Sequence, residues 1–346
     1  MMISCSPKVS VLITTYNSSA TIAACLHSLS DQDYDSMEVI IVENGSGDGT
    51  SQLLERLGPS YQVIYNQMNI GFAGAQNQAI AYAHGAWVLC LNPDTILSPD
   101  FISQLVAVGE QDPYIGAVCG KLRRWNPRET PQRTEIIDST GIYFLRNLRH
   151  LDRGSEELDR GQYERPEYVF GATGAAALYR RAMIESISMD GEFFDEDFFA
   201  YREDADVAWR AQLMGWRCVY NPRAVGWHVR RVTPSRFREL PDFINRHSIK
   251  NRFLMRAKNI SSPLYLRLFV PASLRDVLIL GYCLVFNRRL LSAFSFLWTK
   301  RKAVWEKRKW IQSRRRVSDR VLTKWFSYRP VSFPFPSAGE RCEPAK

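Results

Sequence analysis

The sequence predicts an α/β protein with a doubly wound, mostly parallel sheet and a C-terminal helical appendage. In the first 90 residues, short β-branched apolar runs alternate with helical segments, which is typical of parallel sheets covered by helices. A hydrophobic content of 45% belongs to a globular chain. After residue 262 the pattern changes to apolar and Trp positions at helical spacing with Lys and Arg between them.

Hydrophobic pattern and capping residues define the N-terminal elements. Residues 9–15 are a β-branched apolar run that predicts a buried strand. Asn17-Ser18-Ser19 offers N-caps for a helix at residues 21–30. Further strands are predicted at residues 38–43, 61–65 and 87–91, a helix start at residue 50, and an Ala-rich helix at residues 72–84.

The second half is less regular. The polar, Arg-rich stretch 123–167 predicts irregular strands and loops, whereas residues 203–213 and 241–258 predict helices. We therefore expect one compact domain with a first part at about 1–125 and a second part at about 126–260, a basic amphipathic appendage at 261–329, and a disordered tail at 330–346.

The positive charge is concentrated near the C-terminus. Between Lys300 and Lys324 there are eleven Lys or Arg residues against two acids, an excess that equals the formal net charge of +9 for the whole chain. This distribution excludes a uniform nucleic-acid coat and favours a local anionic partner.

The seven cysteines predict a reducing compartment. Their number is odd and none forms a C-x-x-C pair, so we expect no disulfide framework and no zinc cluster, as in a cytoplasmic protein. Residues 1–8 lack the apolar region of a signal peptide. The longest apolar run, at 277–286, is shorter than the roughly 18–20 residues of a membrane span.

Asn92-Pro93-Asp94 is a candidate metal site, because it directly follows a predicted buried strand. A carboxylate at this position can hold a hard divalent cation, which in turn can bridge a diphosphate. The simpler interpretation is a turn, since Pro and Asp are common turn residues. His228 gains weight only as a second ligand beside Asp94, because a lone His is more often structural.

Acidic and aromatic residues are interleaved over residues 193–206. Glu203, Asp204 and Asp206 lie together at a predicted helix start, where a carboxylate can serve as a general base close to a hydroxyl. Helix capping is the alternative, because acids at a helix N-terminus are favoured by the helix dipole.

A Gly-containing loop opens the helix near residue 72. Backbone amides at residues 69–77 can cradle a phosphate at the helix N-terminus, although a plain strand-to-helix turn fits equally well. The loop lacks the G-x-G-x-x-G pattern, which disfavours a dinucleotide site.

Taken together, five segments resemble family 2 inverting glycosyltransferases of the GT-A fold, and most closely the bacterial rhamnosyltransferase-like branch. The resemblance runs from about Val9 to Lys258. The segments, in the order of the family, are residues 9–17, 42–50, 69–74, 91–95 and 203–210.

The resemblance implies roles for individual residues. Asp204 would be the catalytic base with Glu203 as its neighbour, and Asp94 with His228 would bind Mg²⁺ or Mn²⁺. The implied nucleotide-sugar contacts are Thr15, Tyr16, Asn17, Glu43, Asn69, Gly71, Phe72, Asn77, Asn92 and Asp94. The implied acceptor side comprises Gly171, Ala172, Thr173, Gly174, Tyr201 and Trp209.

Two positions depart from the family pattern. Position 43 is often Asp in the family and is Glu here, so the contact with the base can differ. Position 92 is Asn in place of Asp, which weakens the anionic cage around a metal. We therefore expect the metal to be held loosely and to be seen only with nucleotide bound.

The same resemblance implies substrates and a location. The donor would be dTDP-rhamnose and the acceptor a hydroxyl of a lipid-linked or polysaccharide glycan of the cell envelope. A non-catalytic nucleotide-sugar-binding scaffold at the membrane is the alternative, and a nucleic-acid binder has no other support. The appendage would lie on the anionic inner face of the cell membrane as an interfacial helix, or pack on the domain or on a second copy in a homo-oligomer.

Overall fold

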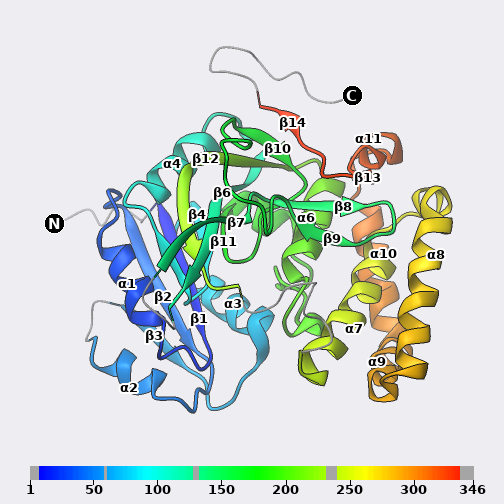
Figure 1. The fold of residues 1–346 in the computed structure, drawn as a ribbon, viewed down its shortest axis with the longest axis horizontal. Helices are drawn as coiled ribbons and strands as arrows, with labels where there is room; N and C mark the ends of the chain where they lie inside the picture. The colour runs from blue at the N-terminus through cyan, green and yellow to red at the C-terminus, as the bar shows by residue number, and fades with distance from the viewer. Residues whose placement is uncertain (1–7, 58–60, 128–131, 231–239, 336–346) are drawn as a thin grey trace.

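The structure is a computed structural model that describes residues 8–57, 61–127, 132–230 and 240–335. A large sheet flanked by helices forms one part of the molecule, and the helices of the C-terminal third stand together at one side of it (Figure 1).

The N-terminal half is a parallel sheet with strand order β3-β2-β1-β4. All seven residues of β1 are buried because this strand lies between β2 and β4, which explains its continuous apolar sequence. The predicted doubly wound α/β fold is confirmed, and the four predicted strands differ from the observed ones by at most one residue. The elements are β1 (Val9–Thr15), α1 (Ile22–Ser30), β2 (Met37–Glu43), α2 (Thr50–Glu55), β3 (Gln62–Tyr65), α3 (Gly71–Tyr82) and β4 (Trp87–Leu91).

The second half extends the same sheet in mixed directions. Strand β11 runs antiparallel between β4 and β6, and β12 is parallel to β6. The region 123–167, predicted to hold irregular strands and loops, contains the end of β6 and all of β7, β8 and β9. The elements are β5 (Thr95–Leu97), α4 (Phe101–Gly109), β6 (Ile115–Asn126), β7 (Gln132–Ser139), β8 (Ile142–Leu145), β9 (His150–Asp152), β10 (Glu167–Val169), β11 (Ala176–Arg180), α5 (Arg181–Ile187), η2 (Glu196–Phe198), α6 (Glu203–Leu213) and β12 (Arg217–His228).

The C-terminal helices do not form the single amphipathic stripe that the sequence suggests. Trp310 and Trp325 pack into the core, whereas Trp298 and Trp305 are exposed. The stripe is divided among several segments, and Trp305 and Trp310 lie on different faces of the same helix, α10. The elements are α7 (Asp242–Asn259), α8 (Ser262–Val285), η4 (Arg288–Leu291), α9 (Ser292–Thr299), α10 (Arg301–Ser313), α11 (Asp319–Thr323), β13 (Phe326–Ser327) and β14 (Phe333–Pro334).

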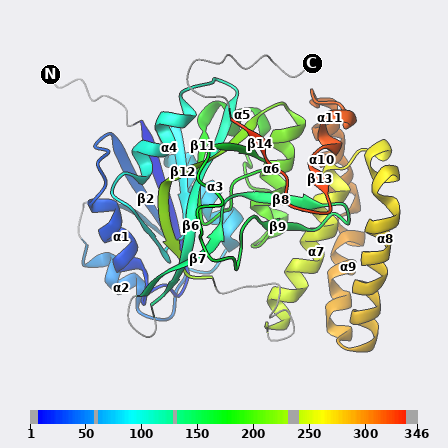
Figure 2. The ribbon, with the colours of Figure 1, turned by 45° about the horizontal axis from the view of Figure 1, so that its top comes forward.

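Helix α8 is the outermost helix in both views of the ribbon (Figure 1, Figure 2). It is continuous through Pro271 and, by length and composition, long and apolar enough to cross a membrane, with 17% of its most apolar window buried. The prediction that no segment reaches that length was wrong, because Arg267 and Arg275 interrupt the apolar run in the sequence and not the helix.

The predicted disordered tail is wrong for its first residues. Phe333 and Pro334 form β14, which pairs antiparallel with β10 at the edge of the main sheet. The Phe333 ring packs against Trp325 and the Phe335 ring against Tyr168. Apolar side chains in this Pro-rich stretch therefore anchor it, and residues 336–346 lie outside the described part of the chain.

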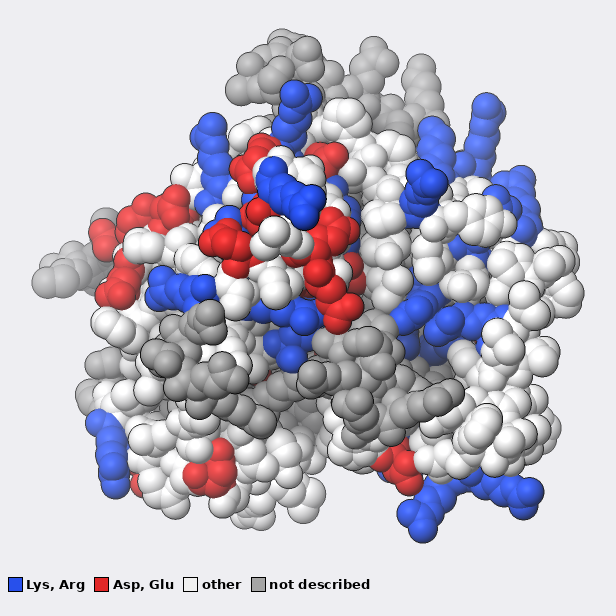
Figure 3. Space-filling model, in the orientation of Figure 1, with Lys and Arg blue, Asp and Glu red and all other residues white. Residues whose placement is uncertain are grey.

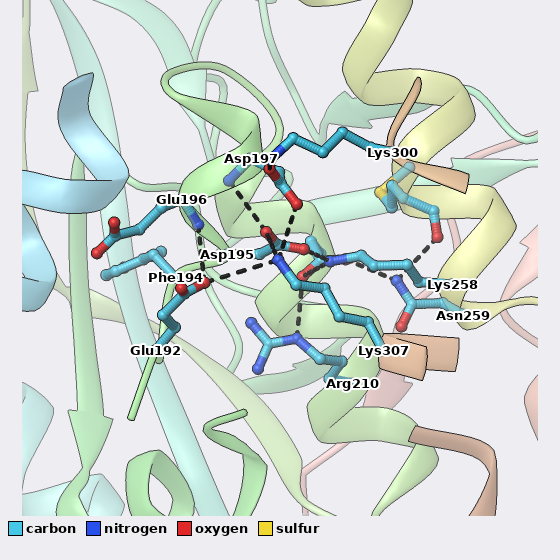
Figure 4. Close-up of polar contacts among 12 residues, drawn as sticks. Glu192, Phe194, Asp195, Glu196, Asp197, Arg210, Lys258, Asn259, Lys300 and Lys307 are labelled. Atoms are coloured by element: carbon cyan, nitrogen blue, oxygen red, sulfur yellow. Dashed lines mark hydrogen bonds and ion pairs between the residues drawn. The ribbon is translucent and has the colours of Figure 1, made fainter. Parts of the chain in front are cut away.

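A buried ion cluster joins the C-terminal helices to the sheet domain (Figure 4). Lys258 of α7 bonds Asp195 and lies 3.1 Å from the Asp206 carboxylate of α6. Arg210 binds the same Asp206 carboxylate at 2.9 Å, and Lys307 of α10 reaches Asp195 at 2.6 Å. Lys258, Asp195 and Asp206 are at most 1% exposed, so each charge depends on the others for compensation.

Replacing Lys258 with Ala should destabilise the protein by about 3–5 kcal/mol, because two buried carboxylates lose their shared cation. Lys309→Ala is the matched control, since that side chain is 57% exposed and pairs only with exposed Glu306; its effect should stay within about 0.5 kcal/mol. Urea unfolding measures both. If both variants lose the same small amount of unfolding free energy, the ion cluster contributes little to stability.

Candidate functional site

The loops after β1 and β2 are tied together at the carboxyl edge of the sheet. The side-chain oxygen of Asn17 accepts a hydrogen bond from the Gly47 backbone amide at 2.9 Å. The backbone amide of Asn17 donates to the Ser46 hydroxyl at 3.0 Å. Glu43 is buried, and its carboxylate accepts from the Gly45 and Ser46 amides at 3.1 and 2.8 Å. The longer Glu in place of Asp therefore holds the shape of this loop.

Thr15 and Tyr16 take different positions beside this loop. Thr15 is fully buried, while Tyr16 is 48% exposed at the end of β1. Only Tyr16 presents a large surface for a ring to stack on in this arrangement.

The loop at residues 69–77 is closed by internal hydrogen bonds. The Gly71 amide donates to the Asn69 side chain at 2.8 Å, and the Ala73 amide donates to the Phe199 carbonyl at 3.1 Å. Gly71 has φ +85°, and a Cβ there would lie 2.6 Å from the Phe199 oxygen. The amides of Gly71 and Ala73, which a phosphate could use, are thus already bonded, and this favours the turn interpretation of the loop.

Asn77 and Phe72 both contact Phe194 within the protein. Asn77 bonds the backbone of Phe194 in both directions, at 2.7 and 2.9 Å. The rings of Phe72 and Phe194 meet edge to face with centroids 5.8 Å apart. These contacts fasten α3 to the acidic and aromatic segment that leads to α6.

Asp94 and His228 converge at the end of β4, as the sequence predicts. Antiparallel pairing of β5 with β12 sets His228 opposite Thr95, so its Nε2 lies 3.4 Å from an Asp94 carboxylate oxygen. The same Nε2 is 3.4 Å from the Asn92 amide nitrogen. Asp94 and His228 are 8% and 7% exposed, respectively, so both are largely shielded from bulk water.

Asp138 stands behind His228 and orients its ring. The carboxylate is 2.8 Å from His228 Nδ1 and 2.7 Å from Arg230 Nε. Burial opposes ionisation of Asp138, but the charges of Arg230 and His228 hold its pKa well below the usual value. Burial likewise lowers the pKa of His228, but Asp138 and Asp94 outweigh it and raise that pKa to about 9.

These groups fit a divalent cation. With Nδ1 turned to Asp138, the imidazole presents Nε2 on the Asp94 side, the carboxylate–histidine arrangement found behind many metals. Within the described residues no group of three or more His, Cys, Asp or Glu could hold a metal. A cation here therefore needs further oxygen ligands from a diphosphate or water.

Asp204 and Glu203 open helix α6, as predicted. One Asp204 oxygen accepts from the Gly174 amide at 3.0 Å and the other from the Ala205 amide at 2.7 Å. Burial raises the pKa of Asp204. Glu203 has a buried oxygen without a hydrogen-bond partner, and burial together with the Asp204 charge raises its pKa to about 8. Burial and the Asp204 charge thus favour the neutral form of Glu203 near neutral pH.

The backbone before α6 is strained. Phe199, Tyr201 and Arg202 have backbone φ angles of +66°, +71° and +73°, which residues other than glycine rarely adopt. Asn251 of α7 holds this turn by donating to the Ala200 and Tyr201 carbonyls at 2.8 and 2.7 Å. Such strain is concentrated at functional sites, which supports a special role for the residues that follow.

A short segment connects the Asp94 side to the Asp204 side. The Asn92 amide donates to the Ala175 carbonyl at 2.9 Å, and Gly174, the preceding residue, donates to Asp204. The predicted metal and base residues therefore lie on two sides of the β4–β11 pairing.

Four of the predicted acceptor-side residues are buried in the protein. Trp209 is fully buried against Phe144 and Phe326, with ring centroids 5.1 and 5.3 Å apart, so no acceptor reaches it here. A Cβ on Gly171 would lie 2.2 Å from the Ala208 Cβ, so this glycine permits close packing of β10 and α6. Ala172 is 2% exposed and belongs to the core, and Thr173 is buried as well.

Sequence reasoning missed Asp138, Arg230 and Asp152. Arg230 joins the two acids, at 2.7 Å to Asp138 and 2.9 Å to Asp152, and its charge offsets part of the rise that burial causes in the pKa of Asp204. Asp138 directly follows Ile136-Ile137 in β7, and an acid beside such an apolar pair was a usable signal. Asp152 lies in the polar stretch that carried no pattern.

Comparison with known proteins agrees with this arrangement. The profile of "Glycosyl transferase family 2" matches residues 10–188, more than half of the chain. The poly-beta-1,6-N-acetyl-D-glucosamine synthase of Staphylococcus aureus (strain COL) is 28% identical over 225 residues, which cover 63% of this chain and 49% of that protein. The chain thus spans about half the length of the curated relatives it matches.

Solved structures share the fold. GalNAc-T7 with UDP, GalNAc and Mn²⁺ superposes with a TM-score of 0.57 at 15% identity, covering 72% of this chain and 48% of that one. The mannosyltransferase PcManGT of Pyrobaculum calidifontis, in complex with GDP-Man and Mn²⁺, gives 0.50 at 19% identity, covering 87% and 76%. The sheet is therefore that of the GT-A fold, and the chain belongs to glycosyl transferase family 2.

Proposed function

We propose that the protein is an inverting glycosyltransferase that moves a sugar from a nucleotide-sugar to a hydroxyl of a lipid-linked or polysaccharide acceptor in cell-envelope glycan synthesis. The observation that carries this proposal is the short bridge between Asp204 and the Asn92–Asp94 turn through Gly174 and Ala175. A single displacement needs one base on the acceptor side and charge stabilisation on the leaving-group side.

In the proposed reaction Asp204 takes the proton of the acceptor hydroxyl as that oxygen attacks the anomeric carbon and the nucleoside diphosphate leaves. Neutral Glu203 lets Asp204 act as the one negative charge of the pair. Asp94 and His228 would hold Mg²⁺ or Mn²⁺, which when bound supplies positive charge to the departing diphosphate. Asp138 keeps the His228 ring in the orientation that this requires.

The donor sugar is a finer proposal. The resemblance to the rhamnosyltransferase-like branch favours dTDP-rhamnose, whereas the named activity of the curated relative concerns an N-acetylglucosamine polymer. We propose dTDP-rhamnose, with an N-acetylglucosamine donor as the competitor. Calorimetric titration of both donors in the presence of Mn²⁺ distinguishes them. Tighter binding of the N-acetylglucosamine donor would overturn the proposal of dTDP-rhamnose.

We also propose that the protein attaches peripherally to the inner face of the cell membrane through residues 261–329. The solvent-facing residues of α8 support this, since Leu266, Val270 and Leu278 are 73%, 74% and 66% exposed. An apolar helical face beside Lys and Arg residues is the composition of an interfacial helix. A second copy of the chain covering the same face is the alternative.

Replacing Asp204 with Asn should lower sugar transfer by at least about 100-fold and leave donor affinity nearly unchanged, because only the base is removed. Asp190→Asn is the control, since Asp190 is an exposed residue with φ +51° that Asn adopts readily. Radiolabelled transfer and donor titration provide the two readouts. Full transfer by the Asp204 variant would exclude Asp204 as the base, and absence of both transfer and donor hydrolysis in the parent would favour the scaffold alternative.

Replacing His228 with Ala should remove the gain in nucleoside diphosphate affinity that Mn²⁺ provides, a loss of roughly 10-fold or more. In EDTA the parent and the variant should bind equally weakly. His27→Ala, with a side chain that is 78% exposed, should behave as the parent. An unchanged Mn²⁺ effect in the His228 variant would place the metal elsewhere.

Glu203 should make stability depend on pH. Its pKa rises from 4.5 to about 8 on folding, so the folded state binds this proton more tightly and the unfolding free energy falls as pH rises between these values. Glu203→Gln should flatten that slope in urea unfolding between about pH 5 and about pH 8. Parallel slopes in parent and variant would contradict the buried, neutral carboxyl.

A further inference from the structure

A group of arginines surrounds His150 where the β8–β9 hairpin, the start of α6, α7 and α8 meet. Lys and Arg side chains gather below this hairpin on the side toward α8 (Figure 3). The guanidinium groups lie within electrostatic reach of one another, because four of the five lower the pKa of another member of the set, and Asp276 pairs with two of them. The set is Arg149, Arg202, Arg252, Arg256 and Arg275.

The electrostatic strain in this cluster is large. Burial first, then Arg275 and Arg149, lower the pKa of Arg202 to about 10. Burial, then Arg202 and Arg275, lower that of Arg252 to about 9. The ring of His150 has a pKa well below its usual value, from burial and these same cations, so it accepts a hydrogen bond from Arg202 at 2.7 Å.

Counter-charge is scarce around the cluster. Asp276 pairs with Arg252 at 3.4 Å and with Arg256 at 2.6 Å. Among the described residues, the guanidinium groups of Arg149 and Arg275 form no hydrogen bond or ion pair. The Nε atoms of Arg275 and of Arg252, a residue only 3% exposed, are buried without a hydrogen-bond partner.

A cluster of like charges with little counter-charge destabilises the folded state unless an anion binds to it. Buried guanidinium groups normally have a partner, because the loss of hydration must be offset. Guanidinium groups with free N–H donors, beside others that are fixed, are the groups that bind phosphate oxygens in pairs. Arg202 is fixed by the Ser248 carbonyl and hydroxyl, each 2.9 Å away, and Arg252 by the Asn147 carbonyl at 2.7 Å.

The cluster adjoins the proposed base. Arg202 directly precedes Glu203 and Asp204, and the Asp204 charge acts on its guanidinium. The donor diphosphate is assigned to Asp94 and His228, on the other side of Gly174 and Ala175. The arginine cluster is therefore a second anionic position, on the acceptor side of the site.

Building on the proposed transferase activity, we propose that Arg149, Arg202, Arg252 and Arg275 bind a phosphate or diphosphate group of the acceptor. Arg149 and Arg275 provide the free donors, and Arg202 and Arg252 add fixed charge.

The source of this phosphate is a lipid. Arg275 lies on α8 between Leu274 and Leu278, which are 64% and 66% exposed, and Val270 one turn earlier is 74% exposed. An anion held by Arg275 therefore sits at the border of the apolar face of α8, as a phosphate joined to a lipid chain would. A sugar attached to that phosphate would extend toward Asp204.

The test compares the full-length parent with the Arg149→Ala/Arg275→Ala double variant, in EDTA so that no metal mediates binding. We expect inorganic diphosphate to bind the double variant at least about tenfold more weakly than the parent. Its Tm should stay equal or rise, because like charges are removed. Arg267→Ala, an exposed arginine of the same helix, should change neither quantity.

Unchanged diphosphate affinity in the double variant, or an equal loss in the Arg267 variant, would overturn the site. A lower Tm with unchanged affinity would make these arginines purely structural. If the double variant fails to fold, Arg149→Lys/Arg275→Lys replaces it. The two lysines keep the positive charge but lack the paired N–H donors of a guanidinium group. Weaker diphosphate binding by this variant therefore supports the site, and diphosphate binding equal to that of the parent overturns it.

Vesicle co-sedimentation distinguishes the sources of the anion. The parent should sediment with phosphatidylcholine vesicles that carry an isoprenyl diphosphate more than with phosphatidylcholine alone, and inorganic diphosphate should compete. Equal sedimentation with both vesicles would overturn the lipid source. Because these are binding measurements in EDTA, their failure is separate from loss of transfer in the Asp204 variant, which tests the proposed reaction.

Discussion

The buried ion cluster around Lys258 fixes the position of α6, the helix that carries the proposed base, relative to the rest of the protein. Asp206 lies two residues after Asp204 on α6, and Lys258 and Arg210 both bind it. Asn259 donates to the same carboxylate at 2.7 Å. Because these charges are compensated only when α6, α7 and α10 are docked together, the C-terminal helices are part of the framework that positions Asp204 and not a detachable coat.

A second constraint is electrostatic separation along one edge of the sheet. On the proposed donor side, Asp138 and Asp94 face His228, an acidic pair around a ring that suits a cation. On the acceptor side, Asp204 is held by backbone amides and Glu203 is driven toward its neutral form. Arg230 links the two sides, because it binds Asp138 and Asp152 and its charge reaches Asp204.

The sequence was sufficient where the pattern is local. Strand β1 and helix α6 have the predicted bounds, because a continuous apolar run and an acid-led helix start are signals contained within each segment. The convergence of Asp94 with His228 followed from the family motif. Pairing of β5 with β12 is the physical reason for it, and no local pattern reveals that pairing.

The misses depend on long-range contacts. Trp209 was predicted on the acceptor side, but the rings of Phe144 and Phe326, on the separate three-stranded sheet of β13, β8 and β9, bury it. Phe199 lies 126 residues after Ala73, whose amide donates to the Phe199 carbonyl, so the sequence could not decide between the phosphate cradle and the plain turn. The arginine cluster likewise draws one residue or two from each of four elements.

The central claim is a single displacement at the anomeric carbon with Asp204 as the only base. It is tested most directly by ¹H NMR of the sugar first released when the enzyme slowly hydrolyses its donor without acceptor, before mutarotation. The account predicts that the released sugar has the opposite anomeric configuration to the donor. Retention of configuration would contradict it, because two displacements would require a nucleophile that this mechanism does not contain.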